Sequence, residues 1–198
     1  MMRLYDSAIS GNSYKVRLAA AQLGVPLDIV PVDILAGESR RPEFLAINPN
    51  GRTPVIVDDD FVLAESNAIL AYLARGTRLW SDERRRSALV LQWLFFEQYS
   101  HEPFIATSRL WRLHKPEGPK RTAALATRRD GGWAALGIME RHLAEHDFFV
   151  DDYSIADIGL FAYTHVAHEG GFPLDALPAV RRWIARVQAT PGFVAMMP

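Results

Sequence analysis

The residues best suited to chemistry flank a predicted β-hairpin near the middle of the first half of the chain. Two short β-branched runs at 53–57 and 61–64 form the hairpin, and a helical run opens at Glu65-Ser66. Ser66 is a good N-cap residue, and free N–H groups in a first helical turn bind anions such as a peptide carboxylate. Residue type alone leaves open that Ser66 only caps the helix.

Pro54 is the unusual residue of the first run, because proline removes a donor from a strand and is tolerated only at an edge or a first position. A cis Thr53–Pro54 bond would turn the backbone of Thr53 outward, leaving its N–H and C=O to pair with an extended peptide. The alternative is a trans proline that merely starts the strand, and the general preference of X-Pro bonds favours it. The hairpin region thus has two features suited to a peptide ligand.

The ordered set of these features resembles the glutathione-binding half of the cytosolic glutathione S-transferase family. The resemblance rests on N-P-N-G-R-T-P-V at 48–55, the hairpin, and E-S-N-A-I-L-A-Y-L at 65–73. A second, independent match is S-I-A-D at 154–157, a capping box before an apolar run, which the family carries at the start of a buried helix of its second domain. The resemblance therefore covers both halves of the chain.

The resemblance implies a glutathione site, with glutathione as co-substrate and no metal. In the family the proline is cis, Thr53 would pair through its backbone with the cysteinyl part, and Glu65 with Ser66 would hold the γ-glutamyl end. Either Arg40 or Arg41 would reach the glycyl carboxylate. Arg52 stands where the family often has Gln or Lys. The implied glutathione-binding residues are Arg40, Arg52, Thr53, Pro54, Glu65 and Ser66.

The chemistry implied by the resemblance requires a thiolate, and a free thiol with a pKa near 8.5 is only a few per cent ionised at pH 7. A helix N-terminus and a hydroxyl or amide donor on the loop before it both stabilise such an anion. In serine-type branches of the family the serine precedes a basic–apolar pair of the helix, and Ser10 fits, with Lys15-Val16 as the pair.

Asn12 is the second candidate for the thiolate contact, because a bacterial branch of the family has Thr-Pro-Asn where this chain has Ser10-Gly11-Asn12. The sequence does not decide whether Ser10 or Asn12 touches sulfur, and both residues are also ordinary helix-capping types. Tyr5 and Ser7 are weaker alternatives, since Tyr5 lies inside the predicted first strand.

The surrounding pattern predicts β-α-β-α-β-β-α and then helices, which is an α/β thioredoxin-like N-terminal domain plus an all-α C-terminal domain. We expect the thioredoxin-like domain at 1–76, a linker at 77–86 and the helical domain at 87–198. The long helical stretches are expected at 85–104, 120–146, 154–168 and 178–189. Gly131, Gly132 and Gly137 weaken the second of them, and a kink or interruption is expected there.

The amino-acid composition argues against several other kinds of binding partner and catalytic site. The 198 residues have 49% hydrophobic content and a net charge of −1, so we expect no general attraction to nucleic acid or to an anionic membrane. The absence of cysteine excludes disulfides, thiolate metal sites and a cysteine nucleophile. The histidine pairs 142/146 and 165/168 do not make a metal site. With no signal-like N-terminus and no apolar span, we expect a soluble cytoplasmic protein.

The function expected from the resemblance is conjugation of the glutathione thiolate to a small apolar electrophile. A second-substrate pocket between the domains would be lined by Tyr99, Phe104, Arg109 and Trp111. Alternatives are a glutathione-dependent disulfide reductase or peroxidase, a glutathione-using isomerase, and a non-catalytic glutathione-binding protein. The family also implies a homodimer.

Overall fold

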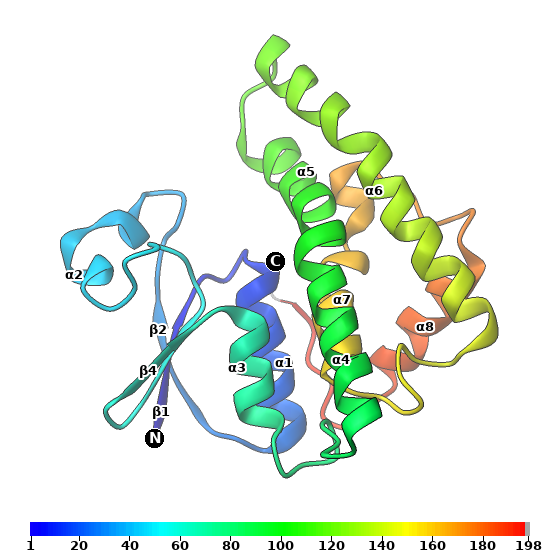
Figure 1. Cartoon of the computed structure of the whole chain (residues 1–198). Coiled ribbons are helices and arrows are strands. Elements are labelled where there is room, and N and C mark those ends of the chain that lie inside the picture. The colour runs from blue at the N-terminus through cyan, green and yellow to red at the C-terminus, as the bar shows by residue number, and fades with distance from the viewer. Residues whose placement is uncertain (197–198) are drawn as a thin grey trace. The chain divides into compact units, whose positions relative to one another are not determined.

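The computed structural model describes residues 1–196, and its contacts divide the chain into two compact units. One unit is Met1–Arg78 together with the segment from Pro191 onward, and the other is Leu79–Thr190 (Figure 1). The sequence-based assignment had placed the C-terminal segment with the helical domain. It belongs to the first unit, where the hydroxyl of Tyr14 donates to the carbonyl of Val194 over 2.7 Å.

The first unit is built on a mixed four-stranded sheet with strand order β2-β1-β3-β4. β1 is parallel to β2 and antiparallel to β3, and β3 forms a hairpin with β4. Its elements are β1 (Met2–Asp6), α1 (Gly11–Leu23), β2 (Leu27–Pro31), the 3₁₀ turn η1 (Glu38–Arg40), α2 (Pro42–Leu45), β3 (Val55–Asp58), β4 (Phe61–Ala64) and α3 (Ser66–Ala74). The predicted β-α-β-α-β-β-α order, and with it the thioredoxin-like class, is confirmed.

The two faces of this sheet follow from the alternation of side chains along each strand. Leu4 and Ile56 are fully buried on the face that α1 and α3 cover side by side (Figure 1). On the other face Tyr5 lies next to Val55, and Phe44 of α2 packs edge-on against the Tyr5 ring at 5.9 Å. Burial on both faces fixes the register of β1 and β3, so the loops at their ends are held in place.

The second unit is helical throughout. Its elements are α4 (Arg84–Phe96), the π-helical turn η2 (Glu97–His101), α5 (Glu102–His114), α6 (Pro119–Glu145), α7 (Ile155–Thr164), the 3₁₀ turn η3 (Ala167–Gly170) and α8 (Pro178–Gln188). Every residue of α7 is buried, and α4, α5 and α8 pack around it (Figure 1). No helix within residues 1–196 is both long enough and apolar enough to span a membrane.

The predicted capping box opens α7. The backbone N–H of Ser154 donates to Asp157 over 3.0 Å, and the Ser154 hydroxyl accepts from the N–H of Ala156 over 3.2 Å. Asp157 also accepts from the indole N–H of Trp183 over 2.9 Å and from the backbone N–H of Phe149 over 3.1 Å. The box therefore ties the start of α7 to α8 and to the loop before it.

Two helix predictions for this unit were wrong. The predicted single helix at 85–104 is interrupted by η2, since Pro103 has no N–H and regular α-helical bonding cannot continue through it. The expected interruption at Gly131–Gly132 does not occur, and α6 is continuous. A Cβ at Gly131 would lie 2.5 Å from the Phe104 ring, and one at Gly132 2.4 Å from the Phe172 ring, so these glycines permit close packing.

Candidate functional site

Ser10 begins the site as the N-cap of α1. Its extended backbone (φ −83°, ψ 121°) and its hydroxyl, which accepts from the N–H of Ser13 over 3.3 Å, are those of a capping residue. The Ser13 hydroxyl in turn accepts from the N–H of Ser7 over 3.2 Å. The loop from β1 to α1 is thus fixed by its own serines, which orient the N-terminus of the helix.

Asn12 and Ser66 connect the N-termini of α1 and α3. The Ser66 hydroxyl donates to Oδ1 of Asn12 over 3.2 Å and accepts from Nζ of Lys15 over 3.3 Å. Lys15 is 0% exposed, and its ammonium also donates to Oδ1 of Asn67 over 3.4 Å. A buried cation, a hydroxyl and an amide therefore gather beside two helix N-termini, and all of these groups favour an anion.

The helix α3 starts differently from the sequence-based expectation. Ser66 is not the N-cap but the first helical residue, and Glu65 is the N-cap. Glu65 has φ 72° and ψ 111°, a conformation uncommon for a residue with a side chain, and it is exposed. Left-handed φ at a non-glycine residue recurs at ligand sites, where the surrounding structure fixes it. The hydroxyl of Ser66 is engaged with α1 and not with its own helix.

The loop before β3 carries the predicted cis bond, Thr53–Pro54. Asn48, which is buried, holds this loop: its Nδ2 donates to the carbonyl of Arg52 over 2.8 Å and its Oδ1 accepts from the N–H of Asn50 over 3.1 Å. Pro54 is buried and Thr53 is half-buried. The N-P-N-G motif thus acts through the Asn48 side chain, which shapes the segment that presents Thr53.

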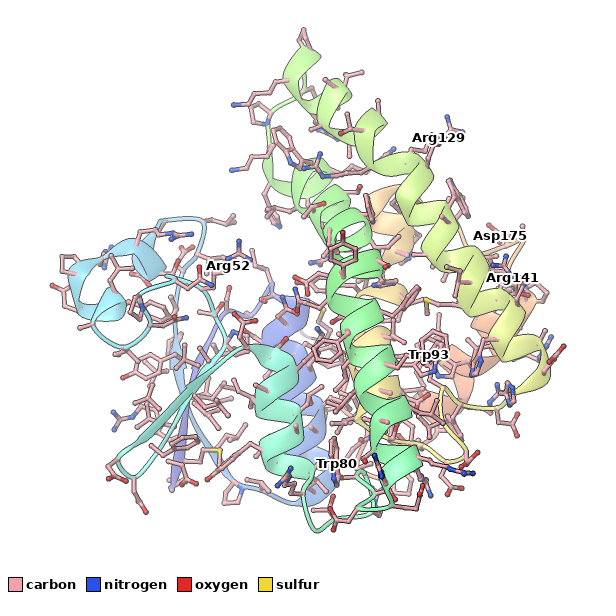
Figure 2. The ribbon with its side chains drawn as sticks, in the orientation of Figure 1. Arg52, Trp80, Trp93, Arg129, Arg141 and Asp175 are labelled. Carbon is pink, nitrogen blue, oxygen red and sulfur yellow. The ribbon has the colours of Figure 1, made fainter. Side chains whose placement is uncertain are left out.

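The arginines near this loop have distinct surroundings. Arg40 donates from Nη1 to the carbonyl of Asn50 over 2.9 Å and lies against Gly51, whose φ of 62° needs glycine. Arg41 pairs with Glu38 over 3.1 Å. Arg52 is exposed on the loop before β3 (Figure 2). The structure therefore brings Arg40 to the predicted peptide-binding loop and directs Arg41 to a different partner.

Two buried basic residues of α1 were missed as site residues from sequence. The sequence pattern indicates Lys15 only as part of the basic–apolar pair that follows Ser10, yet its ammonium donates to the Ser66 hydroxyl. Arg17 forms a buried ion pair with Asp6 and donates to the carbonyl of Ala8 over 3.3 Å, which ties the end of β1 and the following loop to α1. The available signal was a basic residue at 15 and 17 within an otherwise apolar helix.

The four residues predicted for a second-substrate pocket all belong to the helical unit and have separate environments. Tyr99 is 85% exposed on η2, and Trp111 is half-buried on α5. The Phe104 ring packs over Gly131 of α6. Arg109 forms an ion pair with Glu169 of η3. Their joint role stays a prediction.

His142 and His165, one from each predicted histidine pair, make ring-stacking contacts. His142 stacks on His146 at 4.4 Å, and burial lowers the pKa of His142. Burial also lowers the pKa of His165, which stacks on Phe161 and bonds its carbonyl. Across residues 1–196, no three histidine, aspartate or glutamate side chains gather as a group that could hold a metal ion.

Comparison with known proteins identifies the scaffold. The family described as the glutathione S-transferase N-terminal domain matches residues 1–75. Glutathione S-transferase 3 of Zea mays is 30% identical over 97% of this chain and 91% of its own length. This chain belongs to the glutathione S-transferase family. A crystal structure of a glutathione S-transferase from Pseudomonas fluorescens Pf-5 matches this chain with a TM-score of 0.95 and 45% identity. The match covers 100% of this chain and 99% of the other.

Two further relatives extend the comparison. A glutathione transferase from Phanerochaete chrysosporium, solved with oxidized glutathione, has a TM-score of 0.87 and 25% identity, covering 96% of this chain and 90% of the other. Protein URE2 of Eremothecium gossypii is 34% identical over 72% of this chain. The chain spans about two fifths of that relative, covering 42% of its length. The predicted family is confirmed, and the branch stays a proposal.

Proposed function

We propose that this chain binds glutathione on its first unit and conjugates the glutathione thiolate to a small apolar electrophile. The observation that carries the proposal is the cluster of Ser66, Asn12 and Lys15 beside the start of α1, together with the cis Thr53–Pro54 bond. The cluster offers an anion site, and the loop offers backbone groups to a peptide. Glutathione has both features.

The proposed binding mode follows the polarity of these groups. The γ-glutamyl carboxylate binds at the N-terminus of α3, where Ser66 offers its N–H and turns its hydroxyl proton from Asn12 to the carboxylate, and Lys15 adds positive charge. The exposed carboxylate of Glu65 pairs with the γ-glutamyl ammonium. Thr53 pairs with the cysteinyl backbone. At the glycyl end we assign Arg40, which already lies against the loop, with the exposed Arg52 as an additional donor.

The thiolate is stabilised at the N-terminus of α1. Ser10 and Asn12 are the proposed donors to the sulfur anion, through the Ser10 hydroxyl proton and the Asn12 Nδ2–H. In their present bonds Oγ of Ser10 accepts from the Ser13 N–H and Oδ1 of Asn12 accepts from the Ser66 hydroxyl. Neither group is basic enough to remove the proton, so the thiol proton leaves to solvent. The thiolate then attacks the electrophilic carbon, a sulfur–carbon bond forms, and the leaving group departs with its electron pair.

The remaining parts of the proposal concern the electrophile and the assembly. Tyr99, Phe104, Arg109 and Trp111 are proposed to contribute to the second-substrate pocket, whose aromatic character suits an apolar or aromatic electrophile. We propose a homodimer acting in the cytoplasm without a metal. Sedimentation of the purified chain measures the dimer directly, and a monomer at micromolar concentration would contradict it.

Glutathione-dependent disulfide reduction is the second candidate function. It is favoured by the Phanerochaete chrysosporium relative, whose structure holds oxidized glutathione, and by the pairing of a hydroxyl and an amide at Ser10 and Asn12. With no cysteine in the chain, the second thiol must come from another glutathione molecule. One glutathione thiolate attacks the substrate disulfide, which forms a mixed disulfide and releases one substrate thiol. The second glutathione thiolate attacks the glutathione sulfur of the mixed disulfide, which forms oxidized glutathione and releases the other substrate thiol.

Parallel turnover assays with a nitro-activated aryl chloride and with a mixed disulfide of glutathione distinguish these functions. We expect conjugation, with Ser10→Gly and Asn12→Ala each lowering kcat/KM and Ser87→Ala leaving it unchanged. Ser10→Gly is informative because glycine is nearly as good an N-cap as serine, so the hydroxyl is removed with little loss of helix stability. Disulfide turnover without conjugation would replace the first function by the second.

A further inference from the structure

The end of α5 and the first half of α6 form a part of the helical unit that contains no buried residue. Ser108 and Gly132 are buried, but none of residues 109–131 between them is. The first residue that α6 contributes to the core is Gly132. Figure 1 shows the end of α5 and the start of α6 extending past α7 and α8. Residues 109–131 are called the helical tip below.

The helical tip has an excess of positive charge that the composition of the whole chain conceals. It contains seven arginine or lysine residues and two acidic residues, Glu117 and Asp130. The rest of the chain has 15 basic and 21 acidic residues, so the net charge is only −1. The expectation of no general attraction to an anionic membrane rests on that net charge. A local concentration of cations attracts an anionic surface even when the whole chain is nearly neutral.

Most of the cations in the helical tip are not neutralised. Arg109 pairs with Glu169 of η3, and Arg121 pairs with Glu117 over 3.6 Å. The Glu117 side chain is 91% exposed, so the second pair is screened by solvent. Among the described residues the other five cations have no ion pair, and one of them extends from α6 in Figure 2. These five are Arg112, Lys115, Lys120, Arg128 and Arg129.

Two leucines of the helical tip are exposed beside these cations. The exposed fraction is 37% for Leu110 and 48% for Leu113. The two leucines are three residues apart on α5, so they share one face of the helix. Basic residues combined with exposed leucines are typical of helices that lie in the interface of an anionic bilayer. A nucleic acid would attract the cations through its phosphates but would not bury the leucines.

We propose that the helical tip docks on an anionic phospholipid membrane, with its cations on the lipid phosphates and Leu110 and Leu113 inserted at the boundary of the acyl chains. Charge complementarity provides the attraction, and burial of the leucines favours a lipid surface over other polyanions. The tip belongs entirely to the helical unit. The proposal therefore does not rest on glutathione binding by the first unit.

The test is co-sedimentation of the full chain with vesicles of phosphatidylcholine that contain about one third phosphatidylglycerol, and in parallel with vesicles of phosphatidylcholine alone. We expect binding to the anionic vesicles and no measurable binding to the zwitterionic ones. The double variant Lys115→Gln/Lys120→Gln should bind the anionic vesicles about 25-fold more weakly, since each basic residue near such a surface contributes about fivefold. Both lysines are exposed, so the substitutions leave the fold intact.

The matched control is the double variant Arg84→Gln/Arg85→Gln. It removes the same charge from two exposed positions at the start of α4, outside the helical tip. Its affinity for the anionic vesicles should equal that of the wild type. Equal losses in the two double variants would overturn the proposal, because they would show that the charge of the whole chain, and not the tip, determines binding.

Leu113→Gln tests the apolar contact separately from the charge. Glutamine is a good helix former, so α5 is retained, and binding to the anionic vesicles should weaken by about fivefold through loss of leucine burial. Raised salt should weaken binding of the wild type and of this variant alike. Unchanged affinity in Leu113→Gln, equal binding to the two kinds of vesicle, or binding to a short DNA duplex without binding to vesicles would each overturn the proposal.

Discussion

The hydroxyl of Ser66 donates a hydrogen bond to Oδ1 of Asn12 over 3.2 Å, which joins the N-termini of α3 and α1. The two residues are 54 positions apart in the sequence and belong to the two helices that cover one face of the sheet. Lys15 reaches the same hydroxyl from within α1. The proposed anion site and the proposed thiolate site therefore share a hydrogen-bond network.

The first prediction concerns the thiol of bound glutathione. Ser10→Gly removes the proposed donor to the sulfur, so the pKa of the bound thiol should rise by about one, since one pKa unit is about 1.4 kcal/mol and a hydrogen bond to a charged group is worth about that much. Titration of thiolate absorbance in the complex measures it. An unchanged thiol pKa in Ser10→Gly, combined with a raised pKa in Asn12→Ala, would assign the contact to Asn12.

The buried ion pair between Arg17 and Asp6 should be important for folding. Arg17→Met leaves the Asp6 carboxylate buried without its partner, which typically costs about 3–5 kcal/mol. Arg3→Met is the control, because the Arg3–Asp28 pair is 3.5 Å long and exposed to solvent, and such pairs contribute little to stability. Urea unfolding followed by tryptophan fluorescence gives both values. Similar losses in the two variants would contradict the assigned role.

The capping carboxyl of α7 should make stability depend on pH. Burial raises the pKa of Asp157 from 3.8 to about 6, against the opposing effect of donors from Trp183, Phe149 and Ser154. Since the folded chain binds this proton more tightly, the contribution to stability is fully present below about pH 4 and is lost as the pH rises through 6. A pKa change of about 2 corresponds to about 3 kcal/mol.

Comparison of the wild type with Asp157→Asn isolates this effect from other carboxyls. Asn at 157 keeps one oxygen acceptor, but its NH₂ group replaces Oδ2 and cannot accept the hydrogen bond from the Ser154 N–H. The variant should therefore be less stable by about 1–3 kcal/mol at low pH. The difference between the two proteins should shrink between pH 4 and 6. Parallel pH profiles for the two proteins would show that Asp157 does not titrate in this range.

Two glycines of α6 should respond oppositely to the same substitution. Gly132→Ala would place a Cβ 2.4 Å from the Phe172 ring and should destabilise the helical unit by about 1–3 kcal/mol through overpacking. At Gly137 the nearest atom is 3.7 Å away, so Gly137→Ala should stabilise the helix by about 0.5–1 kcal/mol. Thermal unfolding measures both. Destabilisation by both substitutions would contradict the prediction, because it would mean that the distance from the new Cβ to its nearest atom does not determine the change in stability.

The parts of the fold that sequence could predict are those with local signals. The two β-branched runs of the hairpin and the S-I-A-D box each specify a structure within a few residues, and the structure has a hairpin and a capping box at these places. The cis bond at Pro54 was indicated by resemblance, because the local preference of X-Pro bonds points to trans. Short sequence motifs therefore predicted the strands and helices, but they did not predict the cis peptide bond at Pro54.

The parts that sequence could not predict depend on contacts between distant residues. Gly131 and Gly132 resemble helix breakers until the rings of Phe104 and Phe172 are placed against them. Ser66 has the residue type of an N-cap, but its hydroxyl bonds to Asn12 and Lys15. Glu65 occupies the N-cap position and makes no capping bond through its side chain. The role of Lys15 in the site required the packing of α1 against α3.

The most direct test of the proposed glutathione site is calorimetric titration of the wild type and of Ser66→Ala with reduced glutathione, with Ser87→Ala as control. We predict one site per chain in the wild type, unchanged affinity in Ser87→Ala, and affinity about 10–100-fold lower in Ser66→Ala, as expected for loss of a hydrogen bond of about 1.5–3 kcal/mol to a carboxylate. Absence of glutathione binding by the wild type, or equal affinity in Ser66→Ala, would contradict the proposed site.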